Sequence, residues 1–217
     1  WTFAGLFLVA RKCRMYGGLI DSNQTEHSEE TMITKPFSES EVRRIEKELS
    51  RRTDKVRDLA LFRMGVDTML RTSDLRNLRV ADVCEANGAI AQRIEVKMKK
   101  TGGRVICVLD ERTQAALQHW IKSANKSHED WLFTGRKGNE PITDVQHRRL
   151  VKEWCEMAGI DGARRSTHSV RKTKASVIFK KTQNIEAVRR LLGHASVANT
   201  SRYLGVENED ALELAMG

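Results

Sequence analysis

Cysteine is scarce in this chain of 217 residues, and the spacing of the four that occur argues against two common kinds of site. Cys13, Cys84, Cys107 and Cys155 lie far apart, with no Cys-x-x-Cys pair and no histidine beside any of them. Such spacing disfavours a zinc site and gives no disulfide framework. Reduced, buried thiols in a cytoplasmic protein are the simplest expectation.

Long apolar runs are absent as well. No segment approaches the roughly 20 apolar residues that a membrane-spanning helix needs. The apolar stretch 1–10 is short and has no basic segment before it, so it makes a poor signal peptide. The sequence also lacks internal repeats and low-complexity tracts. We therefore expect no membrane partner.

What the chain has in excess is positive charge. Its 38 Lys and Arg residues against 29 Asp and Glu give a formal net charge of +9. This excess favours a polyanionic partner, of which nucleic acid is the commonest, although a generally basic protein of another kind is the alternative. The length suits one domain with a substantial core better than two complete ones.

The apolar periodicity predicts an α+β protein that is mainly α-helical, with one small antiparallel sheet of about three strands. Residues 1–35 are expected to form a helix (1–16) and a polar, turn-rich linker, and residues 36–217 a single domain. Ser38 and Glu41 form a capping-box pattern, and alternating apolar residues on both sides of 101–103 predict a hairpin. Helices are predicted at about 38–49, 53–70, 111–124, 144–158, 167–182, 184–192, 196–204 and 208–216, and a further short helix is predicted to open at Thr72-Ser73-Asp74.

The segment 162–185 contains no acidic residue and seven basic ones. Within it His168 and Arg171 are three residues apart on a predicted helix, so they share a face near its start. The free N–H groups of a helix start favour an anion, and a histidine beside a guanidinium could bind a phosphate and move a proton. A solvated basic face with a capping histidine is the alternative.

Four further residues are candidates for function. His194 closes a predicted helix, and Tyr203, one of only two tyrosines, follows nine residues later. Arg71 precedes Asp74 by three residues, so the carboxylate could hold the guanidinium, although an ordinary surface ion pair explains the pattern equally well. Lys100 lies at the tip of the predicted hairpin, where it could reach into a groove. Each signal is modest alone.

Taken together and in this order, these residues resemble the signature of the tyrosine recombinases, a family that includes phage integrases and site-specific DNA invertases. That signature is an Arg in a helix, a Lys in a β-hairpin, His-x-x-Arg, a His or Trp, and a Tyr. The resemblance covers about residues 37–217. The matching contexts are Leu70-Arg71-Thr-Ser-Asp74-Leu75, Lys100-Thr-Gly, His168-Ser-Val-Arg171, Leu191-Leu-Gly-His194 and Arg202-Tyr203-Leu204-Gly205.

The resemblance implies a catalytic domain that cuts and rejoins DNA. Tyr203 would attack the scissile phosphorus, form a 3′-phosphotyrosyl link and release a 5′-hydroxyl. Arg71 and Arg171 would hold the non-bridging oxygens. No metal and no other cofactor is implied.

The same resemblance assigns the proton transfers. Lys100 would protonate the leaving 5′-oxygen, and His168 would accept the proton of the tyrosine. His194 would add a hydrogen bond to the phosphate, and Asp74 would brace the neighbouring arginine. Backbone contacts with DNA are expected from Arg164, Arg165, Lys172 and Lys174.

The implied partners are double-stranded DNA and three further copies of the chain, which would form a homo-tetramer on paired sites. The tail beyond the tyrosine has no Lys or Arg and carries an apolar stripe at helical spacing, Ala211, Leu212, Ala215 and Met216. It would dock on a neighbouring copy, or alternatively fold back on its own domain. A bacterial or phage-encoded cytoplasmic protein is expected.

Two departures from the family pattern leave alternatives open. Lys172 follows Arg171 where many relatives carry His, and residues 1–35 leave no room for the usual DNA-clamping domain. Residues 1–16 are then either the end of a truncated clamp or part of a short prophage-type integrase, which we favour. Other functions to be weighed are a non-catalytic or regulatory DNA-binding relative, a type IB topoisomerase, and a plain basic structural protein.

Overall fold

The computed structural model describes residues 34–135 and 140–205. The predicted helices 1–16 and 208–216 lie outside these ranges. The described elements are, in chain order, α2 (Glu39–Ser50), a 3-10 turn (Thr53–Lys55), α3 (Val56–Thr68), α4 (Thr72–Arg76), a 3-10 turn (Val80–Asp82), β1 (Arg93–Lys97), β2 (Arg104–Val108), α5 (Glu111–Ser123), α6 (Asp144–Met157), α7 (Thr167–Thr182), α8 (Ile185–Leu192) and α9 (Val197–Leu204).

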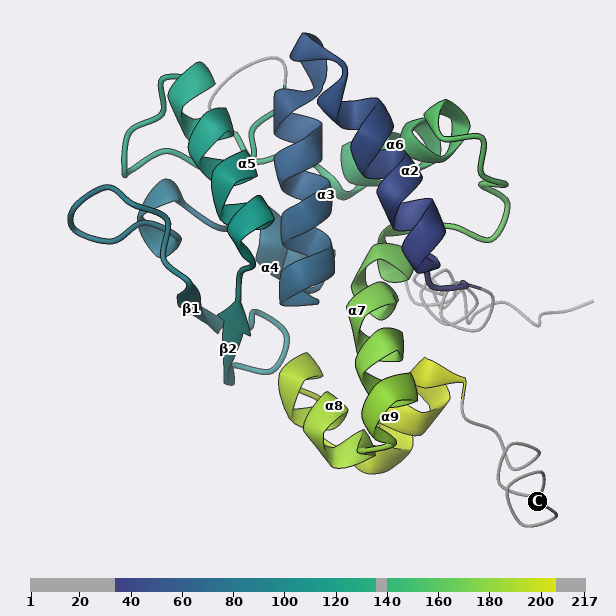
Figure 1. Ribbon diagram of the computed structural model, residues 1–217. Coiled ribbons are helices and arrows are strands. Elements are labelled where there is room, and N and C mark those ends of the chain that lie inside the picture. Colours follow the sequence, from purple (N-terminus) through teal and green to yellow (C-terminus); the bar gives the residue numbers. More distant parts are fainter. Residues whose placement is uncertain (1–33, 136–139, 206–217) are drawn as a thin grey trace, which may run out of the picture.

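These elements form a helical body from which one helix leads down to a small C-terminal group (Figure 1). Helices α2, α3, α5 and α6 make up the upper body, and the β1–β2 hairpin lies at its lower edge. Helix α7 begins against the body and descends to α8 and α9. The α+β fold predicted from the sequence, mainly helical with a small antiparallel sheet, is confirmed. Every helix in the described ranges is too short or too polar to cross a membrane.

Local signals in the sequence explain where the helices begin. The Ser38 side chain accepts a hydrogen bond from the Glu41 N–H, and the Glu41 carboxylate accepts one from the Ser38 N–H, which is the predicted capping box. Ser166 caps α7 in the same reciprocal way with Ser169. These caps satisfy backbone amide groups that would otherwise have no partner, and they therefore fix where each helix begins. Both helices begin within one residue of the predicted position.

The sheet is smaller than expected. Among the described residues it has two antiparallel strands, with Arg93 opposite Val108 and Lys97 opposite Arg104. The expected additional strand does not form, since the segment between Arg79 and Ile90 contributes only isolated bridges. Along each strand buried and exposed residues alternate, so one face of the hairpin packs on the body.

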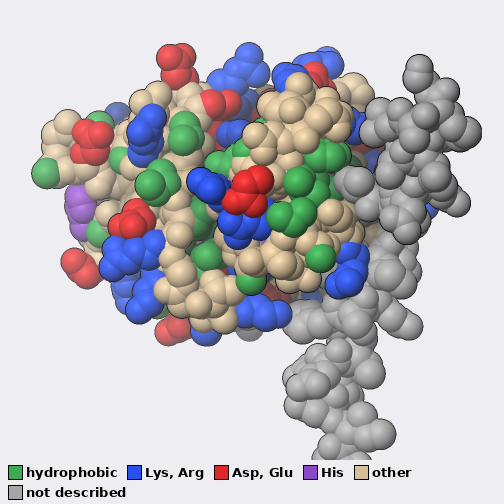
Figure 2. Space-filling model, turned by 90° about the horizontal axis from the view of Figure 1, so that it is seen from below, with side chains coloured by type: hydrophobic (Ala, Val, Ile, Leu, Met, Phe, Trp, Pro, Cys, Tyr) green, Lys and Arg blue, Asp and Glu red, His purple; other side chains and the backbone are tan. Residues whose placement is uncertain are grey.

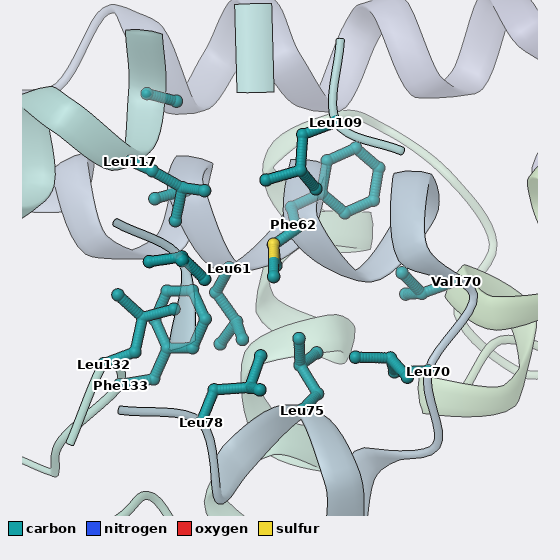
Figure 3. Close-up of a cluster of buried hydrophobic side chains, with 14 of the residues drawn as sticks. Leu61, Phe62, Leu70, Leu75, Leu78, Leu109, Leu117, Leu132, Phe133 and Val170 are labelled. Atoms are coloured by element: carbon teal, nitrogen blue, oxygen red, sulfur yellow. The ribbon is translucent and has the colours of Figure 1, made fainter. Parts of the chain in front are cut away.

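The main core lies between α3, α5 and the loops that surround them (Figure 3). Leu61 and Phe62 of α3 are completely buried, as is Leu117 of α5. Helix α7 joins this core through Val170, which approaches α3 so closely that a Cβ on Gly65 would lie 2.9 Å from a Val170 methyl carbon. The first half of α7 is therefore fixed to the body.

A buried histidine makes the stability of this body sensitive to acid. His147 of α6 is 2% exposed, packs edge-on against the Trp154 ring, and has no hydrogen-bond partner at either ring nitrogen. Burial lowers its pKa to about 4, well below the ordinary value of 6.5.

Because the folded-state pKa is the lower one, stability is complete above pH 6.5 and falls as the pH drops from there through 4. We expect His147→Phe to remove about 3 kcal/mol of this loss, measured by urea unfolding at pH 7 and pH 4.5. His119→Gln, on the exposed face of α5, is the control and should follow the wild type. Parallel acid losses in wild type and His147→Phe would contradict the assignment.

Candidate active site

Arg171 is the centre of the candidate site. It lies one turn into α7, on the side that faces the end of α8, and its residue surface is only 3% exposed. Its Nη2 atom donates a hydrogen bond to the carbonyl oxygen of Leu192 at 2.8 Å. Burial lowers the pKa of this guanidinium, and the charge of Arg71 lowers it further. Arg171 forms no ion pair among the described residues.

His194 lies in the turn after α8 and contacts Arg171 directly. Its Nε2 is 3.5 Å from Arg171 Nη2, and its Nδ1 is 3.2 Å from the hydroxyl of Thr200, which itself donates to the Ser196 carbonyl. Since the threonine proton is used there, Nδ1–H donates to Thr200 and Nε2 accepts from the arginine. Burial and the charges of Arg171 and Arg71 lower the pKa of His194 to about 4, which keeps the ring neutral.

Tyr203 is on the last turn of α9 and completes this group. Its ring stands perpendicular to the His194 ring with centroids 5.2 Å apart, and the Arg171 guanidinium carbon is 5.8 Å from its centroid. The hydroxyl oxygen is buried and forms no well-aligned hydrogen bond, although the Arg171 guanidinium is near enough to interact with it. Burial raises the pKa of Tyr203 to about 12, although the charges of Arg171 and Arg71 oppose the rise. The phenol is therefore neutral and enclosed in this conformation.

Arg71 reaches the same place from the body. Helix α3 ends before Met69, which has a left-handed φ of 52°. Arg71 then occupies the N-cap position of α4, without a capping hydrogen bond from its side chain. The Arg71 Nη1 atom is 3.4 Å from the sulfur of Met98, and within the described ranges no carboxylate pairs with it. Two guanidinium groups thus bring positive charge to Tyr203 and His194 without acidic neutralisation.

The remaining predicted site residues are Lys100, His168 and Asp74. Lys100 is exposed in the turn between β1 and β2, and His168 is half-buried in the first turn of α7 on the side of Arg171. Asp74 does not brace Arg71 as expected. One of its oxygens accepts the backbone N–H of Lys99 at 2.9 Å, and the other is buried with no partner. A backbone donor at the hairpin turn, and not the Arg71 guanidinium, forms a hydrogen bond with this carboxylate.

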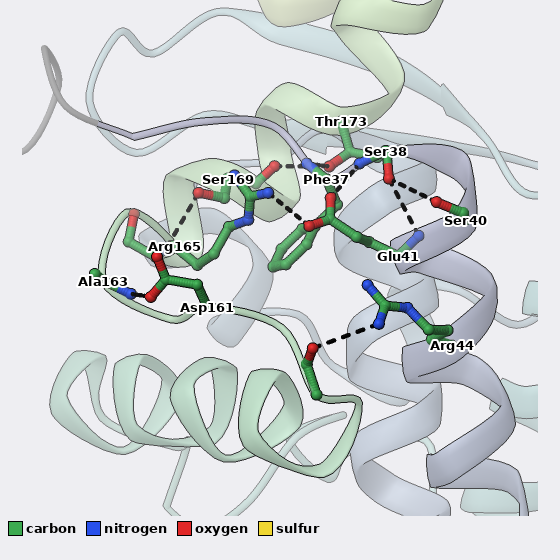
Figure 4. Close-up of polar contacts among 12 residues, drawn as sticks. Phe37, Ser38, Ser40, Glu41, Arg44, Asp161, Ala163, Arg165, Ser169 and Thr173 are labelled. Carbon is green, nitrogen blue, oxygen red and sulfur yellow. Dashed lines mark hydrogen bonds and ion pairs between the residues drawn. The ribbon is translucent and has the colours of Figure 1, made fainter.

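The four lysines and arginines expected to contact DNA have different surroundings. Arg165 pairs with Glu41 at 2.7 Å and so ties the start of α7 to the start of α2 (Figure 4). Lys174 pairs with Asp67 at 2.8 Å. Lys172 is 6% exposed, with its ammonium 4.9 Å from the centroid of the Tyr203 ring, and Arg164 is exposed just before α7. Contact of these four with DNA stays a prediction.

Charge is mixed over the face that carries the hairpin, α8 and α9, which is the lower side of Figure 1. Figure 2 views this face and shows Lys and Arg side chains spread among Asp, Glu and hydrophobic ones. Groups of three or more His, Cys, Asp or Glu that could hold a metal ion do not occur in the described ranges.

Three residues of the site were missed at the level of sequence. Thr200 orients the His194 ring, Arg189 donates to the His194 carbonyl at 2.7 Å, and Met98 contacts Arg71. The only available signal was the helix start at Ser196, which places Thr200 one turn into α9 and close to the preceding histidine.

Comparison with known families agrees with this geometry. The sequence profile of the phage integrase family matches residues 35–210. The chain belongs to the phage integrase family. Its relatives include a probable integrase/recombinase, YoeC, of Bacillus subtilis, which is 28% identical over 153 residues that cover 70% of this chain and 80% of the relative.

Other family members are longer than this chain. Tyrosine recombinase XerH of Campylobacter jejuni is 30% identical over 74% of this chain and 44% of its own length. A tyrosine recombinase of Pseudothermotoga lettingae is 33% identical over 66% of this chain and 48% of its own length. The chain thus spans about half the length of these two proteins.

Solved structures share the fold of the described domain. The crystal structure of XerA recombinase superimposes with a TM-score of 0.69 at 23% identity, over 85% of this chain and 65% of that one. A pre-cleavage complex of XerH with its difH substrate gives a TM-score of 0.67 at 20% identity, over 84% of this chain and 54% of that one.

The pairing of Arg165 predicts that part of the basic segment stabilises the fold. Arg165→Ala removes the ion pair with Glu41, in which the Arg165 side chain is 12% exposed and the Glu41 side chain 15% exposed. It also removes the contact of the guanidinium with the Phe37 ring. We expect the unfolding free energy to fall by about 1–2 kcal/mol, measured by urea denaturation at pH 7. Lys180→Ala, in the same segment but exposed, should leave the midpoint unchanged. Equal unfolding midpoints for both variants would show that Arg165 does not stabilise the fold.

Proposed function

We propose that this family member cuts and rejoins DNA at specific sites through a 3′-phosphotyrosyl link formed by Tyr203. The observation that supports the proposal most is the grouping of Tyr203, His194 and Arg171, with Arg71 close enough to affect the pKa values of all three. A tyrosine beside two guanidinium groups without acid partners suits attack on a phosphodiester.

In the proposed step the phenolic oxygen of Tyr203 forms a bond to the scissile phosphorus and the bond from phosphorus to the 5′-oxygen breaks. His168 accepts the phenolic proton, and Lys100 donates a proton to the leaving oxygen. One phosphodiester replaces another, so no ATP is consumed, and the reverse reaction rejoins a strand. Arg71 and Arg171 hold the two non-bridging oxygens and offset the charge that develops on them.

The buried hydroxyl indicates that the described conformation is a resting one. Tyr203 is neutral and its oxygen is enclosed, so a phosphate has access only after α9 shifts. An arriving phosphate opposes the arginine charges that lower the pKa of His194. Binding DNA therefore moves His194 towards its protonated form, in which Nε2 donates to the phosphate.

The partners follow from the same reaction. Double-stranded DNA is the substrate, and exchange of strands between two sites requires a homo-tetramer, linked through the tail beyond residue 206. The XerH structures, in which that recombinase is bound to a difH substrate, provide a precedent for DNA binding. A type IB topoisomerase would instead relax supercoils without pairing sites, and a regulatory relative would bind DNA without forming adducts. Neither alternative is favoured by the relatives.

The test of the nucleophile is Tyr203→Phe on a nicked suicide substrate that traps the covalent adduct. We expect DNA binding to be retained and adducts to disappear. Because the hydroxyl forms no well-aligned hydrogen bond and interacts with the nearby Arg171 guanidinium, its removal should change the melting temperature little, which separates loss of chemistry from loss of folding. Arg202→Gln, an exposed change one residue earlier, is the control. Adducts with the Phe variant would exclude Tyr203 as the nucleophile.

Arg171→Lys tests the geometry of the arginine. An ammonium cannot contact the Leu192 carbonyl, His194 and a phosphate oxygen as the planar guanidinium can, although the charge is kept. We expect adduct formation in a single turnover to slow by about 10²-fold. Arg190→Lys, exposed on α8 and paired with Glu186, should react like the wild type. A rate for Arg171→Lys within about twofold of wild type would be incompatible with this role.

A further inference from the structure

Met98 occupies an unusual place at the base of the hairpin. It follows β1 directly, and its residue surface is 5% exposed although Lys97, Lys99 and Lys100 around it are exposed. Its N–H donates to the Gly103 carbonyl at 2.8 Å, and its carbonyl accepts from the Gly102 N–H at 2.9 Å. Met98 thereby closes the turn that carries Lys100.

The end of the Met98 side chain lies against the turn between α8 and α9. A Cβ on Gly193 would be 2.4 Å from Met98 Cε and 2.6 Å from its sulfur, so this position accepts no side chain unless Met98 moves. Gly193 also has a left-handed φ of 62°. Met98 therefore lies against the residue that directly precedes His194.

The third contact is with Arg71, whose Nη1 lies 3.4 Å from the Met98 sulfur. A thioether is a weak acceptor without charge, so it contacts the guanidinium and leaves its charge for a ligand. One side chain thus contacts three segments of the site: the turn with Lys100, Arg71, and the turn with His194.

We propose that Met98 is a positioning residue that sets where Lys100 lies relative to Arg71 and His194. The inference rests on the proposed function, in which Lys100 protonates the leaving 5′-oxygen. Asp74, in α4 of the body, anchors the same turn through the Lys99 N–H. Met98 contacts both sides, Arg71 on the body and Gly193 in the turn after α8.

The experiment compares single-turnover cleavage of two suicide DNA substrates. One has the natural 5′-bridging oxygen at the scissile phosphate and the other has sulfur there. A thiolate leaves without protonation, so the sulfur substrate does not require the acid. Met98→Ala should slow cleavage of the oxygen substrate by about 10²-fold and cleave the sulfur substrate at nearly the wild-type rate. Met98→Leu, which keeps the volume, should recover most of the loss.

Gly193→Ala is a second test of the Met98 position, and it keeps every atom of Met98. Its new methyl group displaces the end of the methionine, so the same selective loss on the oxygen substrate is expected. Gly159→Ala is the matched control, because Gly159 follows α6 with a φ of 61° and has open space where the methyl would lie. The Gly159→Ala variant has the same strain, that of an alanine at a positive φ, and should cleave both substrates like the wild type.

Lys100→Ala separates the two hypotheses. Rescue of Lys100→Ala by sulfur, together with equal losses of Met98→Ala and Gly193→Ala on both substrates, would overturn the positioning role alone. Lack of rescue for Lys100→Ala would show that Lys100 is not the acid; the positioning role of Met98 and that step of the proposed function are then wrong, while cleavage through Tyr203 is decided by the adduct assay. Rescue of all three variants is the expected result.

Discussion

The buried guanidinium of Arg171 imposes the constraint on which the rest of the site depends. Removing a charge from water costs several kcal/mol unless acceptors replace the lost hydration. Among the described residues those acceptors are one backbone carbonyl, at Leu192, and one ring nitrogen, of His194. Neither is anionic, so the charge is held in place without being neutralised. The end of α8, the tautomer of His194 and the packing of Tyr203 all follow from this arrangement.

The body supplies the rigidity that keeps such a charge buried. Helix α7 carries Arg171 one residue after Val170, which packs against α3 where Gly65 has no side chain. Arg165 and Glu41 fix the first turn of the same helix to α2. The guanidinium is therefore attached to the main core by its neighbours in sequence, while its own hydrogen bonds reach the C-terminal helices.

Sequence reasoning succeeded where a feature is local and failed where it depends on a distant neighbour. The cap at Ser38 and the apolar periodicity placed the helices, and the ordered signature identified the family. A charged side chain does not reveal its partner, so Arg165 and Lys174 read only as DNA contacts although both form ion pairs within the fold. Asp74 was paired with Arg71, three residues earlier, whereas its hydrogen bond is to the Lys99 N–H, 25 residues away in sequence. Met98 carried no signal, since a single apolar residue among lysines is ordinary in a strand.

The described domain has two separate hydrophobic clusters, and their sizes differ greatly. The second consists of four buried residues, Met69, Ala175, Val188 and Leu192, with Tyr203 among its partly buried neighbours. Regions with few buried apolar contacts open at lower free energy than the global transition. Amide protons of α8 and α9 would then exchange with solvent sooner than those of α3. The polypeptide can expose its tyrosine by a local opening while the larger cluster remains folded.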